Sequence, residues 1–368
     1  MNDLKRVSVN LKERSYDILI GSNQFDYLSK ILKELDIGNY AVIITNPKIK
    51  KLLQDKITRP LKKISLRSNF IQVPDSEKSK SIKYLISTIS KISKLDIKKR
   101  VFIIALGGGV IGDLAGFVAS IYKRGIPYIQ IPTTLLAQVD SSIGGKVAVD
   151  LDCGKNLLGA FYQPRLVFSD ISLLSSLNQR QILSGLAEII KYGVISDKEL
   201  FDYIKHNYYK ILELDEKVLI YIISRSAKIK ARIVSNDEKE QKGIRTILNF
   251  GHTIGHAIEA ASGYSQKYTH GEAIAFGMVC AADLANSLNI CDSKTLSQLE
   301  SLISRVGLPV HIKNPSLSRI MKAYLHDKKF ISGKNRFVLP LKIGKVDIFE
   351  DIPEDRIKEV IKRRIKRK

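Results

Sequence analysis

The sequence predicts two domains, an α/β domain over residues 1–171 followed by a mainly α-helical domain over residues 172–368. In the first half, short β-branched runs alternate with amphipathic helical stretches, whereas helical periodicity dominates the second half. A chain of 368 residues is long for a single domain, and its 44% hydrophobic content is enough for a large core.

Three apolar runs in the first half are the clearest predicted strands. They cover residues 40–45, 101–106 and 128–131, and helical patterns lie between them. This βαβ rhythm predicts a Rossmann-like sheet. In the second half, residues 182–191 and 273–284 have the periodicity of helices.

The chain is strongly basic, with a net charge of +23 at pH 7. Lysine is spread through almost every segment, and no helix-turn-helix, zinc-finger or RNP pattern accompanies it, so we expect no nucleic-acid partner. The charge favours small anionic substrates instead. The basic end, residues 356–368, is expected to be a solvated helix.

The location expected from the sequence is the cytoplasm. The first residues run into strand-like sequence without the pattern of a secretory signal, and no apolar run is long enough to span a membrane. The three cysteines are an odd number and form no CxxC pair, which favours a reducing compartment.

A glycine-rich turn follows the strand predicted at 101–106. Gly107, Gly109 and Gly112 satisfy the spacing G-x-G-x-x-G before a helix, where backbone N–H groups can approach a pyrophosphate. A standard dinucleotide fingerprint also has an acidic residue about 20 positions later. Residues 130–134 read QIPTT and contain no acidic residue, which disfavours an ordinary Rossmann dehydrogenase. The alternative to a pyrophosphate-binding turn is a turn with a purely structural role.

Three of the six histidines fall in one short window, at His252, His256 and His270. His252 and His256 are four residues apart, on one face of a helix, and His270 is expected in a loop before a helix that starts near Glu272. This spacing suits a metal site. Thr253 stands where a metallopeptidase carries its catalytic glutamate, so peptide hydrolysis is disfavoured.

A catalytic metal usually has three protein ligands, and Glu188 is the best third candidate. It lies in an otherwise apolar helical stretch, where a carboxylate is costly unless it faces a cation or a metal. An ion pair with Lys191, one turn later, is the alternative.

A second polar cluster lies at residues 140–146 and at Lys155 and Asn156. Lysines on glycine-rich loops bind phosphate or carboxylate groups, and asparagine can orient a hydroxyl. Arg245 is a further candidate for binding an anion, with simple surface exposure as its alternative.

Eight short blocks of sequence, taken in order, resemble the 3-dehydroquinate synthase family and span nearly the whole chain. The blocks are residues 107–113, 132–134, 143–146, 155–156, 188–193, 248–259, 270–272 and 327–329.

The resemblance implies an enzyme of the shikimate pathway of aromatic amino acid biosynthesis. Its substrate would be a small phosphorylated sugar acid, 3-deoxy-D-arabino-heptulosonate 7-phosphate, and its products 3-dehydroquinate and phosphate. The resemblance also implies a homodimer, bound NAD, and Zn²⁺ or Co²⁺ held by Glu188, His252 and His270.

By the same resemblance, the NAD contacts come from six segments between residues 75 and 176. They are Asp75, Ser76, Glu77, Lys78, Ser79, Lys80, Gly109, Val110, Ile111, Gly112, Asp113, Thr133, Thr134, Lys146, Lys155, Leu173, Leu174, Ser175 and Ser176. Ser76 and Ser176 depart from the family pattern, which has glycine and threonine there.

The resemblance places the substrate contacts in both halves, with His256 as proton donor or acceptor. They are Asp140, Lys146, Asn156, Lys191, Lys230, Arg245, Asn249, His256 and Lys328, with Arg124 contributed across a dimer interface. Compared with the family pattern, this chain has one extra residue between Glu238 and Arg245. Two other readings stay open: a metal-dependent polyol or glycerol-phosphate dehydrogenase, and a sugar-phosphate cyclase with another substrate.

Overall fold

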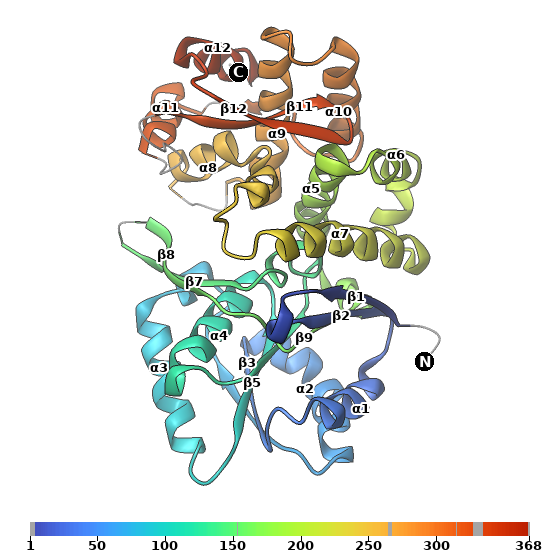
Figure 1. The fold of residues 1–368 in the computed structure, drawn as a ribbon, viewed down its shortest axis with the longest axis vertical. Coiled ribbons are helices and arrows are strands. Elements are labelled where there is room, and N and C mark those ends of the chain that lie inside the picture. The colour runs from blue at the N-terminus through green and yellow to red at the C-terminus, as the bar shows by residue number, and fades with distance from the viewer. Residues whose placement is uncertain (1–3, 153, 264–266, 314, 327–333, 367–368) are drawn as a thin grey trace. The chain divides into compact units, whose positions relative to one another are not determined.

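The structure is a computed structural model that describes residues 4–152, 154–263, 267–313, 315–326 and 334–366. The chain forms two compact units (Figure 1). The first contains Met1–Leu177 and Leu219–Lys239, and the second contains Asn178–Val218 and Glu240–Lys368. The first division lies close to the expected one at 171/172, but the sequence did not predict that a later segment belongs to the first unit.

A seven-stranded sheet forms the centre of the first unit, in the order β1-β2-β9-β6-β5-β3-β4. Only β1 runs antiparallel to its neighbour within this sheet. The strands are β1 (Lys5–Val9), β2 (Tyr16–Gly21), β3 (Tyr40–Thr45), β4 (Arg67–Gln72), β5 (Val101–Gly107), β6 (Tyr128–Pro132) and β9 (Leu166–Asp170). The three strands expected from sequence are β3, β5 and β6.

The parallel register brings the carboxyl ends of the central strands to one edge. Gly107, the last residue of β5, lies opposite Pro132, the last residue of β6. The N–H of Thr133 donates a hydrogen bond to the carbonyl oxygen of Gly107 at 3.0 Å. The glycine-rich turn and residues 133–134 therefore lie side by side at this edge, where open α/β sheets bind ligands.

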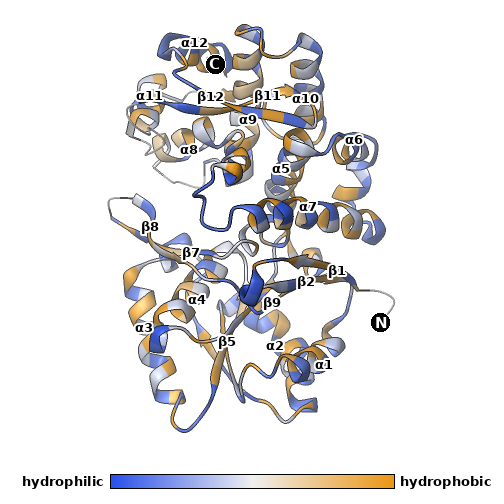
Figure 2. Cartoon of the chain, in the orientation of Figure 1, coloured by the Kyte–Doolittle hydropathy of each residue, from blue (hydrophilic) through white to orange (hydrophobic). Residues whose placement is uncertain are grey.

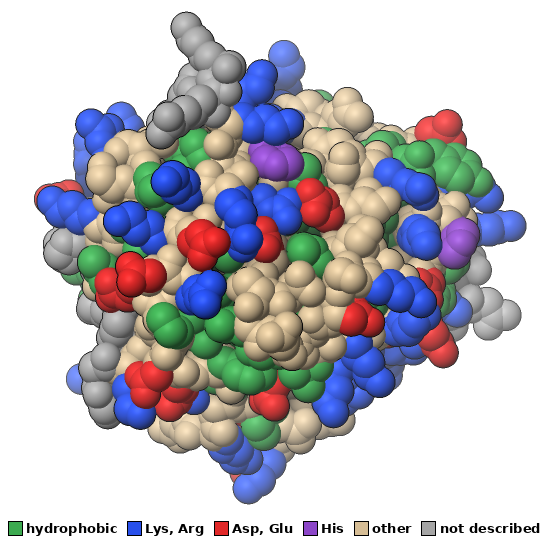
Figure 3. Space-filling view, turned by 90° about the horizontal axis from the view of Figure 1, so that it is seen from above, with side chains coloured by type: hydrophobic (Ala, Val, Ile, Leu, Met, Phe, Trp, Pro, Cys, Tyr) green, Lys and Arg blue, Asp and Glu red, His purple; other side chains and the backbone are tan. Residues whose placement is uncertain are grey.

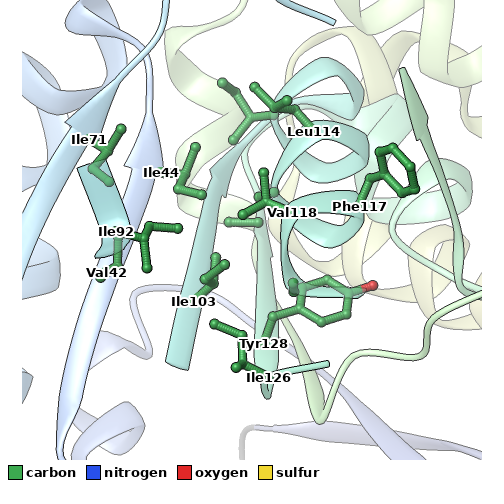
Figure 4. Packing of buried hydrophobic residues seen from close by; sticks show 14 of the residues in the cluster. Val42, Ile44, Ile71, Ile92, Ile103, Leu114, Phe117, Val118, Ile126 and Tyr128 are labelled. Atoms are coloured by element: carbon green, nitrogen blue, oxygen red, sulfur yellow. The ribbon is translucent and has the colours of Figure 1, made fainter. Parts of the chain in front are cut away.

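Four helices pack on the two faces of the sheet. They are α1 (Phe25–Leu35), α2 (Pro47–Lys63), α3 (Ile82–Leu95) and α4 (Gly109–Ile121). Alternate strand residues point to opposite faces. Val42 and Ile44 pack in a cluster with α3 and α4 (Figure 4), whereas Ala41 and Ile43 pack with α1 and α2. In Figure 2 these helices carry both hydrophobic and hydrophilic residues, as helices with one buried face do.

The first unit also contains an antiparallel pair of strands, β7 (Lys146–Leu151) and β8 (Gly154–Phe161). The later segment that belongs to this unit is most of helix α7 (Glu216–Asn236). Lys230 of α7 forms an ion pair with Asp140 at 2.7 Å, and Glu238 just beyond α7 pairs with Arg14 at 2.8 Å.

The second unit is mainly helical, which confirms the predicted fold class. Its helices, besides the start of α7, are α5 (Gln179–Ser196), α6 (Lys198–Leu212), α8 (His252–Ala261), α9 (His270–Ser287), α10 (Ser293–Arg305), α11 (Leu317–His326) and α12 (Glu354–Arg364). Short strands pair as β11 (Arg336–Lys342) with β12 (Lys345–Glu350) and as β10 (Ile312–Lys313) with β13 (Ile365–Lys366).

The basic end of the chain is not simply solvated, contrary to the expectation from its charge. Arg364 is only 8% exposed, and its guanidinium pairs with Asp283 of α9 at 2.9 Å and with Glu300 of α10 at 2.6 Å. On the face shown in Figure 3, Lys and Arg side chains lie among Asp and Glu side chains rather than in one stripe. Among the described residues, no helix is long and apolar enough to cross a membrane.

Candidate active site

Three helices of the second unit bring Glu188, His252 and His270 together. Glu188 comes from the middle of α5 and is fully buried, while the histidines begin α8 and α9. Oε1 of Glu188 lies 3.6 Å from Nε2 of His252 and 3.4 Å from Nε2 of His270. One potential ligand atom from each residue therefore lies within 4.8 Å of the other two.

Helix capping places His270 at this point. Thr269 accepts a hydrogen bond from the N–H of Glu272, and the Glu272 side chain accepts one from the N–H of Thr269. This reciprocal capping box starts α9 at His270. The expectation that His270 lies in a loop was wrong, because the helix begins two residues earlier than its apolar pattern suggested.

Glycines allow α8 and α9 to approach closely enough for the histidines to converge. A Cβ on Gly277 of α9 would lie 2.0 Å from the carbonyl oxygen of Gly251. Gly251 caps α8 with φ of 78°, a left-handed conformation that favours glycine. The two histidine rings consequently have centroids 5.6 Å apart.

Hydrogen bonds orient both imidazole rings. Nδ1 of His252 lies 3.1 Å from the carbonyl oxygen of Phe250, and Nδ1 of His270 lies 3.2 Å from Oε2 of Glu259. A carbonyl or a carboxylate can only accept, so Nδ1 is the donor in each case. In a neutral ring, Nε2 is then left with its lone pair on the side of Glu188.

Glu188 also contacts the ammonium group of Lys191, whose side chain is 2% exposed. The ion pair that was one alternative for Glu188 is therefore present, while its other carboxylate oxygen faces the two histidines and stays a predicted metal ligand. Burial lowers the pKa of His270, but the hydrogen bonds that its ring donates to Glu188 and Glu259 raise it by more, to about 10. Each ring nitrogen of His270 therefore faces a carboxylate.

The donor set fits a divalent metal. Two imidazole nitrogens and one carboxylate oxygen are the protein ligands of several catalytic zinc sites, which leave a fourth position open. Co²⁺ accepts the same donor types. A buried carboxylate is costly unless it is paired or coordinates a metal, and Oε1 of Glu188 faces the two imidazoles while Lys191 pairs with Oε2.

The other predicted residues of the second unit lie at different depths. His256 is exposed, and its ring centroid lies 5.1 Å from that of His252. Arg245 is 2% exposed, and its guanidinium lies 3.5 Å from the carboxylate of Glu240. The alternative interpretation, that Arg245 is simply a surface residue, was therefore wrong. Asn249 is the last residue of a short 3-10 helix, Ile244–Asn249. Lys328 lies outside the described residues.

In the first unit, the glycine-rich turn forms the start of α4. Gly108 is its N-cap, Gly109 and the predicted contacts Val110, Ile111 and Gly112 form the first turn, and Asp113 follows directly after it. The first turn of a helix has N–H groups with no partner inside the helix, and these bind anions.

Two side chains next to this turn support a ligand there. A Cβ on Gly109 would lie 3.1 Å from Oγ of Ser141. Oγ of Ser141 and Oγ1 of Thr133 are buried without a hydrogen-bond partner among the described residues. Such hydroxyl groups are costly unless a ligand or water satisfies them. The turn, with its bare glycines and these hydroxyls, fits the phosphates of a dinucleotide.

Lys80 connects Asp113 of α4 to Asn156, a residue predicted to bind substrate. Its Nζ lies 2.5 Å from a carboxylate oxygen of Asp113 and also contacts the side-chain oxygen of Asn156. Burial lowers the pKa of Lys80, but Asp113 raises it by more. Asn156 has a left-handed φ of 56°, and its N–H donates to Asp150 at 2.8 Å.

The remaining predicted NAD contacts bond to other residues of the first unit or are buried. Within the segment before α3, the N–H of Lys78 donates to Oγ of Ser76 at 3.2 Å, and Oγ of Ser79 donates to the carbonyl oxygen of Pro74 at 2.7 Å. Two other residues reach this segment: Nδ2 of Asn46 donates to Asp75 at 2.8 Å, and Lys155 forms an ion pair with Glu77 at 3.3 Å. In the turn after β9, Leu173 and Leu174 are buried, Ser175 donates to Ser172 O, and Ser176 donates to Leu173 O. Thr134 Oγ1 accepts from the N–H of Ala137 at 3.2 Å.

Four predicted residues of the first unit, Asp140, Lys146, Arg124 and Lys230, take no part in these bonds. Asp140 accepts a hydrogen bond from Lys230 at 2.7 Å, which agrees with their assignment to one set. Lys146 is exposed at the start of β7. Arg124 is exposed and has a left-handed φ of 67°. Its part in a dimer interface stays a prediction.

Sequence reasoning missed two acidic residues. Glu259 contacts His270, and Glu240 lies beside Arg245. Glu259 could have been found, because it follows His252 by seven residues and therefore lies on the same helix face. Glu240 lies in an irregular segment, where spacing does not predict contacts.

The fold is shared with several solved structures. A crystal structure of 2-deoxy-scyllo-inosose synthase, complexed with carbaglucose-6-phosphate, NAD+ and Co2+, matches with a TM-score of 0.85 and 28% identity over 98% of this chain and all of that chain. A probable glycerol dehydrogenase from Sinorhizobium meliloti matches with a TM-score of 0.65 and 16% identity over 94% and 95%, which shows the fold alone. The chain therefore has the fold that this synthase and this dehydrogenase share.

Sequence comparison narrows this class to one family. Residues 70–184 match the family model of the 3-dehydroquinate synthase N-terminal part, and residues 185–330 match that of the C-terminal part. A 3-dehydroquinate synthase from Thermodesulfovibrio yellowstonii is 46% identical over 97% of this chain and 99% of its own, and one from Thermoanaerobacter sp. is 47% identical over the same shares. The chain belongs to the 3-dehydroquinate synthase family, which confirms the resemblance found in the motifs.

Proposed function

We propose that this chain converts 3-deoxy-D-arabino-heptulosonate 7-phosphate to 3-dehydroquinate and phosphate, with NAD and with Zn²⁺ or Co²⁺ bound. The observation that carries the proposal is the convergence of Glu188, His252 and His270 in a member of this family. The structural relative solved with NAD+ and Co2+ supports the choice of cofactors.

In the second unit, Glu188, His252 and His270 would hold the metal, which would supply Lewis-acid polarisation of a substrate oxygen. His256, exposed one turn after His252, would take up or release the substrate proton at its imidazole ring. Arg245 and Lys191 supply positive charge for the substrate's phosphate and carboxylate, and Asn249 supplies an amide for its hydroxyl groups.

In the first unit, the start of α4 and the hydroxyls of Thr133 and Ser141 would bind the phosphates of NAD, which would supply reversible hydride acceptance. Asp140, Lys146, Asn156 and Lys230 would orient the substrate.

The remaining NAD contacts predicted from the sequence would support this binding from the segment before α3 and the turn after β9. They are Asp75, Ser76, Glu77, Lys78, Ser79, Lys80, Thr134, Lys155, Leu173, Leu174, Ser175 and Ser176.

We further propose that the chain is a lyase that acts as a homodimer in the cytoplasm, with Arg124 of each chain reaching the partner's substrate. Lys328 would complete the substrate contacts. Sedimentation of the purified protein tests the dimer, since a monomer at working concentration would contradict it.

The decisive experiment mixes the metal-loaded protein with 3-deoxy-D-arabino-heptulosonate 7-phosphate and catalytic NAD, and follows phosphate release and NADH absorbance together. We expect phosphate release with no net NADH, because the hydride is returned within one turnover. Stoichiometric NADH without phosphate would instead indicate a dehydrogenase. Release of neither would contradict the substrate assignment.

A further inference from the structure

The two histidines of the metal site have different acceptors behind them. Nδ1 of His252 donates to a backbone carbonyl, whereas Nδ1 of His270 donates to the carboxylate of Glu259. Hydrogen-bond acceptors behind metal-bound histidines fix the tautomer and raise the basicity of the ligating nitrogen. A carboxylate does this more strongly than a neutral carbonyl, because charged hydrogen bonds are stronger.

The position of Glu259 suits this role. Its side chain is 15% exposed, and it comes from α8, the helix that begins with His252. It reaches across to the first residue of α9, so one side chain connects the two helices that carry the histidines. Its hydrogen bond uses the ring nitrogen of His270 that does not face Glu188.

We propose that Glu259 is a positioning residue of the metal site, which holds His270 with Nε2 directed at the metal and strengthens this ligand by its charge. The inference rests on the metal site of the proposed function. Glu259 would contact neither the substrate nor the metal, so it would act on the metal through His270.

The charge of the site is consistent with this assignment. Glu188 and Glu259 contribute two carboxylates, while the ammonium group of Lys191 contacts Glu188. With a divalent metal bound, the two carboxylates, the ammonium group and the metal together would carry a small net positive charge. If Glu259 were replaced by a neutral residue, the same group would carry one more positive charge in a buried place, which disfavours metal binding.

The test compares Glu259→Gln with the unchanged protein by Co²⁺ binding, without any substrate. Glutamine keeps the length of the side chain and can still accept a hydrogen bond, but it lacks the charge. Competition with a chelator gives the affinity, and the visible absorption of bound Co²⁺ reports its coordination. We expect the affinity to fall about 10- to 100-fold. The cobalt bands are expected to shift, and the stoichiometry to stay at one per chain.

Glu34→Gln is the matched control, since Glu34 lies on α1 in the first unit with a side chain that is 60% exposed. Glu259→Asp shortens the side chain by one methylene, keeps the charge, and is expected to bind Co²⁺ more tightly than Glu259→Gln. This second variant keeps the test decisive if the glutamine variant folds poorly, and thermal unfolding of the metal-free proteins checks folding.

Two outcomes would overturn the proposal. Unchanged affinity and absorption in Glu259→Gln would show that the carboxylate does not act on His270. Two Co²⁺ per chain would make Glu259 a ligand, because His256, Glu259 and His270 also lie close enough to hold an ion. Failure of the unchanged protein to bind Co²⁺ at all would instead contradict the metal site of the proposed function.

Discussion

Glu188 shows how one side chain serves several partners. A carboxylate with no solvent exposure is costly by itself, yet its two oxygens face an ammonium group and two imidazoles. Sequence alone left a metal ligand and an ion pair as alternatives. The structure shows that they are compatible, because Lys191 lies along the same helix and the histidines come from two others.

We predict that Glu188→Gln destabilises the metal-free protein and abolishes metal retention. Removing one partner of a buried ion pair costs about 3 kcal/mol, since the remaining charge stays buried. Urea unfolding with a chelator present measures the stability, and metal analysis measures retention. Glu34→Gln, at an exposed pair, should change the unfolding free energy by less than about 0.5 kcal/mol. An equally small change in Glu188→Gln would refute the prediction.

At the scale of elements, the site depends on where α8 and α9 begin. Both start at a predicted ligand, His252 and His270, and both starts are set by local chemistry. Gly251 supplies a left-handed cap for α8, and Thr269 with Glu272 supplies the capping box of α9. The two histidines are thus held by helix termini rather than by flexible loops, which favours a fixed geometry.

Thr269→Ala is expected to lower the free energy of unfolding by about 1 kcal/mol, because the N–H of Glu272 loses its side-chain acceptor. Cobalt affinity should fall as well, since His270 is the next residue. Thr269→Ser keeps the hydroxyl and should lie within a few tenths of a kcal/mol of the unchanged protein. Urea unfolding and cobalt titration measure both effects. Equal stability of the alanine and serine variants would show that the cap is not needed.

At the scale of the whole chain, the division into units is not sequential. Leu219–Lys239 returns to the first unit, and named contacts explain why. Arg14 and Gln163 both donate hydrogen bonds to Glu238, and the N–H of Asn10 donates to Ser235. Lys230 thereby lies beside Asp140 although 90 residues separate them.

These contacts predict a pH dependence of stability. The hydrogen bond from Arg14 lowers the pKa of Glu238 below its ordinary 4.5, and burial only partly opposes this. A carboxyl group with a lowered pKa stabilises the folded state above its unfolded pKa, and this contribution is lost as the pH falls through the folded pKa.

The unfolding free energy of Glu238→Gln should therefore lie below that of the unchanged protein at neutral pH. The difference should shrink as the pH falls from about 5 to about 3. Urea unfolding across this range measures it. A difference that stays constant with pH would mean that the charge of Glu238 is not involved.

Local pattern determined much of this protein. Apolar runs located β3, β5 and β6, and the i, i+4 spacing located His252 and His256 on one helix. The glycine spacing located the start of α4, and the ordered motifs identified the family. These features depend on residues close in the chain, where period, turn chemistry and helix capping act directly.

Tertiary structure decided the rest. The convergence of Glu188 with the histidines, the pairing of Arg364 with Asp283 and Glu300, and the return of Leu219–Lys239 to the first unit all join residues far apart in sequence. Such contacts depend on how helices pack and which charges are removed from water together. A one-dimensional pattern carries no such information, because the same periodicity is compatible with many packings.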